Sequence, residues 1–275
     1  MPIAASAQVH PTAVIDPQAD LAEGVRVGPY AVIEGAVQIG PDCVVRAHAV
    51  LIGPLTLGRA NDVGIGVVIG ERPQHLQFNE DEPTRTEIGD DNTFREHVTV
   101  HRGTMATGVT RIGSHNYLMA NSHVGHDCRV GNHVIMANGA LMAGHVELHD
   151  RVFVSGNAGI HQFARLGRLS FLSGNSSCTK DLLPFLMMAE RDRVVGINKV
   201  GLRRAGMTLD EIRAVKQAFR ILFRKDVLQK AAIAQLEKEL GDHPIGIELL
   251  EFIRSSKRGF VGAHHCDVHV DREAA

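Results

Sequence analysis

The sequence predicts a mainly β protein, in which a parallel β-helix of hexapeptide repeats is followed by a small α-helical C-terminal domain. The first observation is an apolar residue at every sixth position, a period that fits neither an α-helix nor an alternating strand. In a hexapeptide β-helix each face of a triangular prism uses six residues, so one coil has eighteen. The second is the content of 28 glycines, which suits tight corners. The third is helical periodicity after Gly206.

The apolar ladder has two long stretches separated by two excursions. The first stretch misses no step and comprises Val9, Ile15, Leu21, Val27, Ile33, Ile39, Val45, Leu51, Leu57, Val63 and Ile69. The second comprises Ile112, Leu118, Val124, Val130, Met136, Met142, Leu148, Val154, Ile160, Leu166, Leu172 and Cys178. Residues 71–87 form one polar excursion, and residues 101–108 form the other. Long loops on rigid scaffolds often carry function, so residues 71–87 are either a functional segment or a bulge without a role.

We expect two domains, at residues 1–190 and 191–275, because the ladder fades after Cys178. Thr208 and Glu211 have the spacing of a capping box at the start of a helix. Residues 228–240 and 245–257 predict two further helices. The tail from residue 260 is expected to be disordered, as is usual for termini. The tail also contains residue types that bind metals, namely His264, His265, Cys266 and His269.

The spacing of eighteen places several polar residues on neighbouring coils, roughly 4.8 Å apart. It predicts that Asp127 lies beside His145, that His126 lies beside Gly144, and that Gly144 lies beside Gln162. A glycine beside His126 leaves room for a ligand and a reachable backbone N–H. The cluster therefore has the parts of a general base, a neighbouring carboxylate and an oxyanion donor.

Two other readings of the 16 histidines stay open. Polar side chains suit solvated corners, and His115, His133 and His149 are expected to be such turn residues. Three clustered imidazoles also suit zinc, as in a hexapeptide-repeat hydratase that binds metal between subunits. Clustered titratable groups often mark functional sites, which favours a role for the group around His126.

Composition excludes several classes of protein. The net charge of −2 gives no general attraction to nucleic acid or to anionic membranes. No stretch is long and apolar enough for stable membrane insertion. The N-terminus lacks the pattern of a secretion signal, and the four cysteines show no paired spacing, so a cytoplasmic protein with reduced thiols is expected. A concentrated basic stripe in the second domain is either a solvated helix face or a docking surface for an acidic partner; it comprises Arg213, Lys216, Arg220 and Arg224, with Arg203 and Arg204 just before it.

Several motifs together resemble the UDP-N-acetylglucosamine O-acyltransferase family, which starts lipid A synthesis in Gram-negative bacteria. The resemblance runs from about Val9 to about Gly206. The motifs are Glu82-Pro83-Thr84-Arg85, Val100-His101-Arg102-Gly103-Thr104, His123-x-x-His126-Asp127-Cys128, Ala143-Gly144-His145-Val146, His161-Gln162-Phe163, Gly196-Ile197-Asn198 and Gly201-Leu202-Arg203-Arg204. It implies a left-handed β-helix, a homotrimer with active sites between subunits, and catalysis without a metal or an organic cofactor.

The resemblance also implies a reaction and its residues. A 3-hydroxyacyl chain would pass from acyl carrier protein, received by the basic stripe, to the 3-hydroxyl of UDP-N-acetylglucosamine. His126 would be the general base, Asp127 would orient it, and the Gly144 N–H would stabilise the oxyanion. The substrates would be bound by Gln74, His123, His145, His161, Gln162, Asn198 and Arg204, while Gly174 would set acyl length.

The chain departs from the family at two positions of the first excursion. The resemblance implies Asp and Lys where this chain has His75 and Gln77. A modified UDP-amino sugar, such as the 3-amino analogue, therefore remains an alternative acceptor. A related N-acyltransferase is a further alternative, although it would be expected to carry a separate domain before the repeat. The remaining alternatives are the zinc hydratase and an inactive scaffold.

Overall fold

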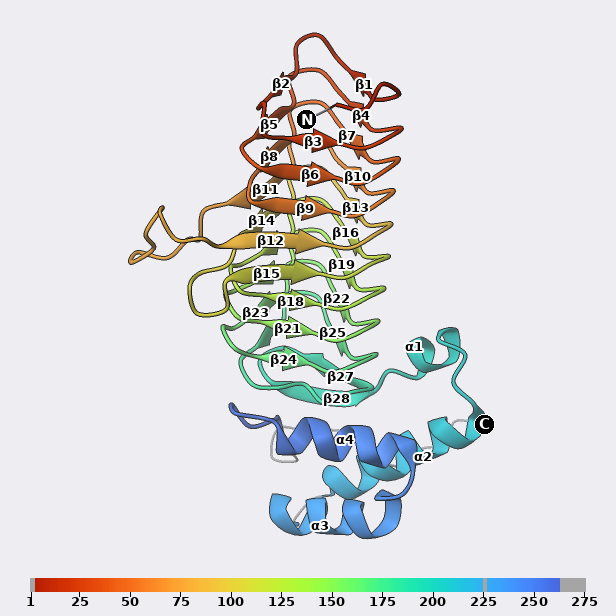
Figure 1. Cartoon of the computed structure of the whole chain (residues 1–275). Coiled ribbons are helices and arrows are strands. Elements are labelled where there is room, and N and C mark those ends of the chain that lie inside the picture. Colours follow the sequence, from red (N-terminus) through yellow and green to blue (C-terminus); the bar gives the residue numbers. More distant parts are fainter. Residues whose placement is uncertain (1–2, 225–226, 263–275) are drawn as a thin grey trace.

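The structure is a computed structural model that describes residues 3–224 and 227–262. The chain winds down a triangular prism, and helices cover its C-terminal end (Figure 1). Successive strands enter a first, a second and a third sheet in turn, and all pairs are parallel except the last, β27 with β28. The winding is left-handed, so the predicted left-handed β-helix followed by helices is confirmed. The metal-binding residue types of the tail, residues 264–269, lie outside the described part of the chain.

Each face of the prism is one sheet of short strands. The first sheet contains β1 (Gln8–Val9), β4 (Arg26–Val27), β7 (Val44–Val45), β10 (Asp62–Val63), β13 (Thr93–Phe94), β16 (Tyr117–Leu118), β19 (Ile135–Met136), β22 (Phe153–Val154), β25 (Phe171–Leu172), β27 (Leu186–Ala189) and β28 (Arg193–Ile197). The second contains β2 (Val14–Ile15), β5 (Val32–Glu34), β8 (Val50–Ile52), β11 (Val68–Glu71), β14 (Thr99–His101), β17 (His123–Val124), β20 (Leu141–Met142), β23 (Gly159–Ile160) and β26 (Ser177–Cys178). The third contains β3 (Asp20–Leu21), β6 (Val37–Ile39), β9 (Leu55–Leu57), β12 (Arg85–Ile88), β15 (Val109–Ile112), β18 (Arg129–Val130), β21 (Glu147–Leu148) and β24 (Arg165–Leu166).

The ladder side chains fill the interior of the prism. Every ladder residue from Leu21 to Cys178 is buried, whereas Val9 and Ile15, near the N-terminal end of the prism, are half-buried. The core is therefore a narrow apolar column along the prism axis, because each strand contributes one inward residue per coil. The turns contribute further buried apolar residues, such as Val25, Val67 and Val134, and their remaining positions can be polar.

Four helices follow the strands within the described residues. They are α1 (Lys199–Arg204), α2 (Leu209–Leu222), α3 (Gln229–Leu240) and α4 (Pro244–Arg254). The capping box of Thr208 and Glu211 is confirmed, but α1 was not predicted. The last helix was expected to reach Lys257 and ends earlier, because Ser255 caps it and Ser256 Oγ donates to Asp181 at 2.7 Å. No helix in the described ranges combines the length and apolarity needed to cross a bilayer.

The helices are held to the β-helix by a buried ion pair. Asp181, which is buried, accepts hydrogen bonds from Arg165 Nε at 2.9 Å and Nη2 at 2.7 Å. The same guanidinium donates to Phe252 O of α4 and lies 4.4 Å from the centre of the Phe252 ring. Both nitrogens donate to the same oxygen, Asp181 Oδ2, and this partly desolvated pair with charge-assisted hydrogen bonds holds the guanidinium in place beside α4. Arg168 and Glu248 form a second pair across the junction at 2.8 Å.

A column of buried asparagines holds together the coils that carry the excursions. Asn61, Asn92 and Asn116 lie at the corner between the third and first sheets. The backbone and side-chain nitrogens of Asn92 both donate to Asn61 Oδ1 at 2.9 Å, and Asn116 N donates to Asn92 Oδ1 at 2.9 Å. The excursions leave the prism from a different corner. The asparagine column therefore continues without interruption and holds successive coils in register, although the excursions insert extra residues between them.

Replacing Asn92 by alanine should lower the free energy of unfolding by about 3 kcal/mol or more, because Asn61 Oδ1 loses a donor and Asn116 N–H loses its acceptor in a buried site. Denaturant titration measures the change. Asn79→Ala, in the exposed first excursion, is the matched control and should change stability by less than about 0.5 kcal/mol. Equal stability of the two variants would contradict a structural role for the column.

Candidate active site

The predicted catalytic residues occupy one corner of the prism, between the second and third sheets. His126 and Asp127 lie in the turn from β17 to β18, while Gly144 and His145 lie in the equivalent turn one coil further on. Both excursions leave from the same corner in the preceding coils, 72–84 between β11 and β12 and 102–108 between β14 and β15 (Figure 1). The fold therefore gathers four turns at one edge.

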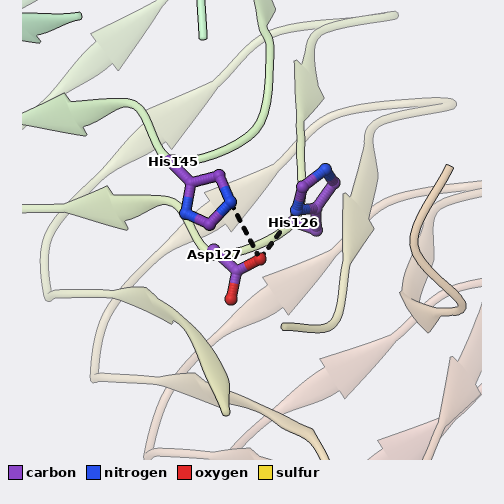
Figure 2. A group of neighbouring side chains, drawn as sticks. All are labelled: His126, Asp127 and His145. Atoms are coloured by element: carbon purple, nitrogen blue, oxygen red, sulfur yellow. Dashed lines mark hydrogen bonds and ion pairs between the residues drawn. The ribbon is translucent and has the colours of Figure 1, made fainter. Parts of the chain in front are cut away.

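The predicted stacking of these two coils is observed. His145 N donates to His126 O at 2.9 Å, and the two rings meet edge to face with centroids 5.2 Å apart. His126 Nδ1 lies 2.7 Å from Asp127 Oδ2, and His145 Nε2 lies 3.5 Å from the same oxygen (Figure 2). Asp127 and His145 both have φ near +60°, which points their side chains out of the corner toward each other.

Asp127 is a buried carboxylate surrounded by donors. Its side chain is 0% exposed, and burial alone would raise its pKa. Hydrogen bonds from His126, Thr107 and Thr104 outweigh burial and hold the pKa of the carboxyl well below its usual range. An ionised carboxylate only accepts hydrogen bonds, so Nδ1 of a neutral His126 carries the proton and Nε2 is left as the acceptor.

Gly144 lies against the ring of His126. A Cβ atom at position 144 would be 2.5 Å from His126 Cε1 and 2.6 Å from Nε2, so no side chain fits here without moving the ring. The described residues provide no hydrogen-bond acceptor for the Gly144 N–H. A free backbone donor thus lies beside the ring nitrogen that accepts protons, as an oxyanion site requires.

The next coil extends the site. Phe163 N donates to Gly144 O at 3.2 Å, and the Phe163 ring stacks on His145 with centroids 4.5 Å apart. His161 is exposed, and its Nδ1 lies 3.1 Å from Gln162 O. Phe163 is 50% exposed, so this end of the cluster offers an aromatic surface to a ligand.

His123 lies on β17, which precedes the turn that contains His126 and Asp127. Its Nδ1 is 2.8 Å from Thr99 Oγ1, and its ring meets that of buried His101 edge to face at 5.1 Å. Burial, together with the neighbouring His101 and His126, lowers the pKa of His123 to about 4. The imidazole is therefore neutral near pH 7 and available as a hydrogen-bonding group.

The first excursion reaches His126. The ring of His75 meets the ring of His126 edge to face, with centroids 5.7 Å apart, and Gln74 and Gln77 are exposed beside it. From the sequence, His75 was identified only as a departure from the family pattern. The contacts of His75, Thr104 and Thr107 were not predicted, because the excursions remove the fixed spacing on which the stacking prediction depends. Phe163 lies eighteen residues after His145, so the same spacing could have predicted its contact.

Three predicted substrate residues lie elsewhere in the chain. Asn198 is buried as the N-cap of α1, where it accepts from Gly201 N at 2.9 Å and donates to Leu169 O at 2.9 Å. Arg204 is exposed at the end of α1, on the side of the prism away from the excursions (Figure 1). Gly174 lies in a turn between the first and second sheets, where a Cβ atom at this position would be 3.4 Å from Gly156 O. One chain does not bring these three to His126.

The cluster has one set of atoms that a metal ion could use. Among the described residues, His126, Asp127 and His145 each offer a ligand atom, and these atoms lie within 4.8 Å of one another. Both oxygens of Asp127, however, already accept hydrogen bonds from Thr104, Thr107 and His126. The donor set suits proton transfer better than metal coordination.

The fold and this corner together define a hexapeptide-repeat transferase. A family profile described as "Bacterial transferase hexapeptide (six repeats)" matches residues 19–53 and 110–144. Another, described as "Udp N-acetylglucosamine O-acyltransferase; Domain 2", matches residues 181–261.

Comparison with known proteins narrows the class. The chain is 47% identical to an acyl-[acyl-carrier-protein]–UDP-N-acetylglucosamine O-acyltransferase of Anaeromyxobacter sp. strain Fw109-5 over 91% of this chain and 98% of that protein. It is 41% identical to the enzyme of that name from Syntrophobacter fumaroxidans, over 92% and 99%. The crystal structure of a Francisella novicida UDP-N-acetylglucosamine acyltransferase matches with a TM-score of 0.91 and 30% identity, over 95% of both chains. The chain belongs to the acyl-[acyl-carrier-protein]–UDP-N-acetylglucosamine O-acyltransferase family.

The pKa of His123 predicts a pH-dependent stability. Between pH 6.5 and about 4 the unfolded chain binds a proton at this residue, whereas the folded protein does not. The free energy of unfolding should therefore be highest above pH 6.5 and fall as the pH is lowered through this window, by roughly 3 kcal/mol from this group.

His123→Gln should remove that part of the decline, while the decline caused by other buried histidines persists. Denaturant titrations at about pH 7 and about pH 4.5, at one protein concentration, measure the difference. Identical declines in the variant and the parent protein would contradict the lowered pKa.

Proposed function

We propose that this protein transfers a 3-hydroxyacyl chain from acyl carrier protein to the 3-hydroxyl of UDP-N-acetylglucosamine, the first step of lipid A synthesis. The observation that carries the proposal is the contact between His126, Asp127 and Gly144, in a chain with relatives of 41% and 47% identity that bear this activity in their names. The thioester is already activated, so the reaction needs only a base and an oxyanion donor.

Each catalytic residue has a defined task in this proposal. Nε2 of His126 takes the proton of the sugar hydroxyl while its oxygen attacks the thioester carbon. The Gly144 N–H donates to the oxyanion of the tetrahedral intermediate. The C–S bond then breaks, the C–O ester bond remains, and His126 returns the proton to the leaving thiolate. Asp127 stabilises the imidazolium between these two transfers.

The proposed acceptor site contains His123, His145, His161, Gln162 and Gln74. All five lie in or beside the four turns of the catalytic corner. Neutral imidazoles and amides suit a sugar, because they both donate and accept hydrogen bonds. Among the described residues, the corner has no feature that favours the 3-amino analogue over UDP-N-acetylglucosamine as the acceptor. His75 contacts His126, so this departure from the family pattern lies beside the proposed base.

We propose a homotrimer in which a neighbouring subunit completes the site. Two observations support it. Asn198 and Arg204 are remote from His126 within one chain. The second observation is that the outer face of the first sheet has a half-buried apolar column, whereas the outer face of the third sheet is charged. The apolar column comprises Tyr117, Ile135, Phe153, Phe171 and Met187. The charged residues are Glu87, Arg111, Arg129, Glu147 and Arg165.

Packing the first sheet of one subunit on the second sheet of the next would bury that column. On the corresponding coils of the second sheet the outward residues are Thr99, His123, Leu141, Gly159 and Ser177, of which Leu141 is apolar and 50% exposed. The same packing would place α1 of one subunit near the catalytic corner of its neighbour, because α1 and that corner lie on opposite sides of the prism (Figure 1). Gly174 would then face the interface that receives the acyl chain.

We propose that acyl carrier protein docks on the basic face of α2. Arg213, Lys216, Arg220 and Arg224 are all exposed in the structure, as are Arg203 and Arg204 on α1. A row of exposed cations next to α1 suits an acidic partner and speeds its association. A cytoplasmic location belongs to this proposal and agrees with Cys43, Cys128 and Cys178 being free thiols.

Replacing His126 by alanine should lower kcat for acyl transfer by roughly 10²–10⁴, because the general base is lost. The assay follows transfer from 3-hydroxyacyl carrier proteins of several chain lengths to UDP-N-acetylglucosamine and to its 3-amino analogue. His133→Ala, in an exposed turn of the next corner, should retain the parental rate. An active His126→Ala enzyme would remove the basis of the proposal.

Reversing two charges on α2, in a Lys216→Glu, Arg220→Glu double variant, should raise KM for acyl carrier protein roughly tenfold and leave kcat and KM for the sugar unchanged. The effect should shrink as salt is added, since exposed charges are screened. The control is Lys238→Glu, which changes an exposed lysine on α3. Equal KM values for the α2 variant and the control would place the docking surface elsewhere.

A further inference from the structure

The second excursion closes over the catalytic carboxylate. Thr104 N donates to Asp127 Oδ1 at 3.0 Å, and Thr104 Oγ1 donates to Oδ2 at 2.8 Å. Thr107 Oγ1 makes a short hydrogen bond to Oδ1. Together with His126 Nδ1 on Oδ2, these contacts engage both oxygens of a side chain that is 0% exposed.

The hydrogen bonds from Thr104 and Thr107 to Asp127 are not needed to close the loop that carries these two threonines. The excursion already closes on itself, since Gly108 N donates to Thr104 O at 2.7 Å. The backbone of Asp127 is held separately, because Asp127 N donates to Thr110 Oγ1 at 2.8 Å. The threonine hydroxyls also bond to backbone atoms of their own loop, since Thr104 Oγ1 accepts from Ala106 N at 3.3 Å and Thr107 Oγ1 lies 3.0 Å from Val109 O. Their contacts with Asp127 are made to the carboxylate group, and the one from Thr104 Oγ1 is to the oxygen that His126 Nδ1 uses.

We propose that Thr104 and Thr107 are positioning residues that keep the Asp127 carboxylate ionised and aimed at His126 Nδ1 during acyl transfer. The proposal rests on the assignment of His126 as the general base. A buried carboxylate without these donors would take up a proton more readily or rotate away from the imidazole. Either change removes the acceptor that keeps the proton on Nδ1 and Nε2 free.

The two threonines differ in what they contribute. Thr104 bridges both oxygens and so sets the rotation of the carboxylate plane, while Thr107 contributes only to the oxygen that His126 does not use. The loop that carries them is tied to the first excursion, since Met105 N donates to Glu82 Oε2 at 3.2 Å. Both excursions therefore contact the catalytic pair: His75 contacts the imidazole, and Thr104 and Thr107 contact the carboxylate.

The direction of the pH effect follows from the charge. Removing a donor from the carboxylate destabilises its ionised form, so the pKa of Asp127 rises toward its ordinary value. The remaining negative charge is also shared with fewer donors and attracts a proton on His126 more strongly. The first effect removes the acceptor that keeps the proton on Nδ1, and the second protonates Nε2 at a higher pH. Both reduce the productive form on the acid side, so the acid limb of the kcat/KM profile moves to higher pH.

The test measures complete pH profiles of kcat/KM for Thr107→Val, Thr104→Ala, Thr107→Ser and Thr104→Ser. We expect the first two variants to lose roughly tenfold or more in kcat near pH 7, the worth of one hydrogen bond to a charged group, with the acid limb shifted upward. The serine variants keep the hydroxyl and should restore both the rate and the limb. In an Asp127→Asn background the threonine substitutions should have no further effect on the profile.

Thr86→Val is the matched control. Thr86 lies on β12 with a buried hydroxyl that has no partner among the described residues, so its removal should leave the profile unchanged. Because Thr104 and Thr107 are changed independently, an unfolded variant of one leaves the other to decide. Parental pH profiles for folded Thr107→Val or Thr104→Ala, alongside an inactive His126→Ala enzyme, would overturn the positioning role and leave the proposed function intact. An active His126→Ala enzyme would overturn both.

Discussion

The stacking of one coil on the next is the constraint on which the rest of this structure depends. Parallel strands bond at a fixed spacing, so a residue and the one eighteen places later are neighbours. At the corner that contains His126 and Gly144, this spacing brings the residues of two short turns into contact, because the hydrogen bond from His145 N to His126 O belongs to the same ladder. The backbone register, rather than any side-chain contact, thus sets the distance between the imidazole and Gly144.

Buried polar groups in this fold are satisfied in two different ways. Away from the corner, asparagines such as Asn61 and Asn92 bond to one another and to the backbone, which yields a neutral column. At the corner a full negative charge is buried on Asp127 and is offset by hydroxyl, amide and imidazole donors. The neutral column stabilises the register, while the buried charge polarises an imidazole. The physical difference is that a buried carboxylate needs several converging donors, which the second excursion brings to Asp127 and which Arg165 and Ser256 bring to Asp181.

The prism also explains why one subunit offers only part of the proposed site. Its faces differ in chemistry: the third sheet has a charged exterior, and the first has the stacked rings of Phe153 and Phe171. A solenoid cannot bend to bring its own opposite corners together, because every coil is fixed by the next. In the proposed homotrimer, groups on α1 would therefore reach the corner that contains His126 in a neighbouring subunit. This accounts both for the apolar outer face of the first sheet and for the separation of Asn198 from His126 within one chain.

The sequence by itself determined the periodic part of this protein. The ladder predicted the prism, the inward residues and the neighbours of His126 and Asp127, because a strand repeat translates spacing into distance without further information. It also determined the capping box of Thr208, a local interaction. Only the tertiary structure decided where the two excursions lie in space. It also decided the contact of His75 with His126, the hydrogen bonds from Thr104 and Thr107 to Asp127, and the early end of α4. These features depend on irregular segments and on contacts between residues far apart in the sequence, and for such residues the spacing in the sequence does not predict a distance in space.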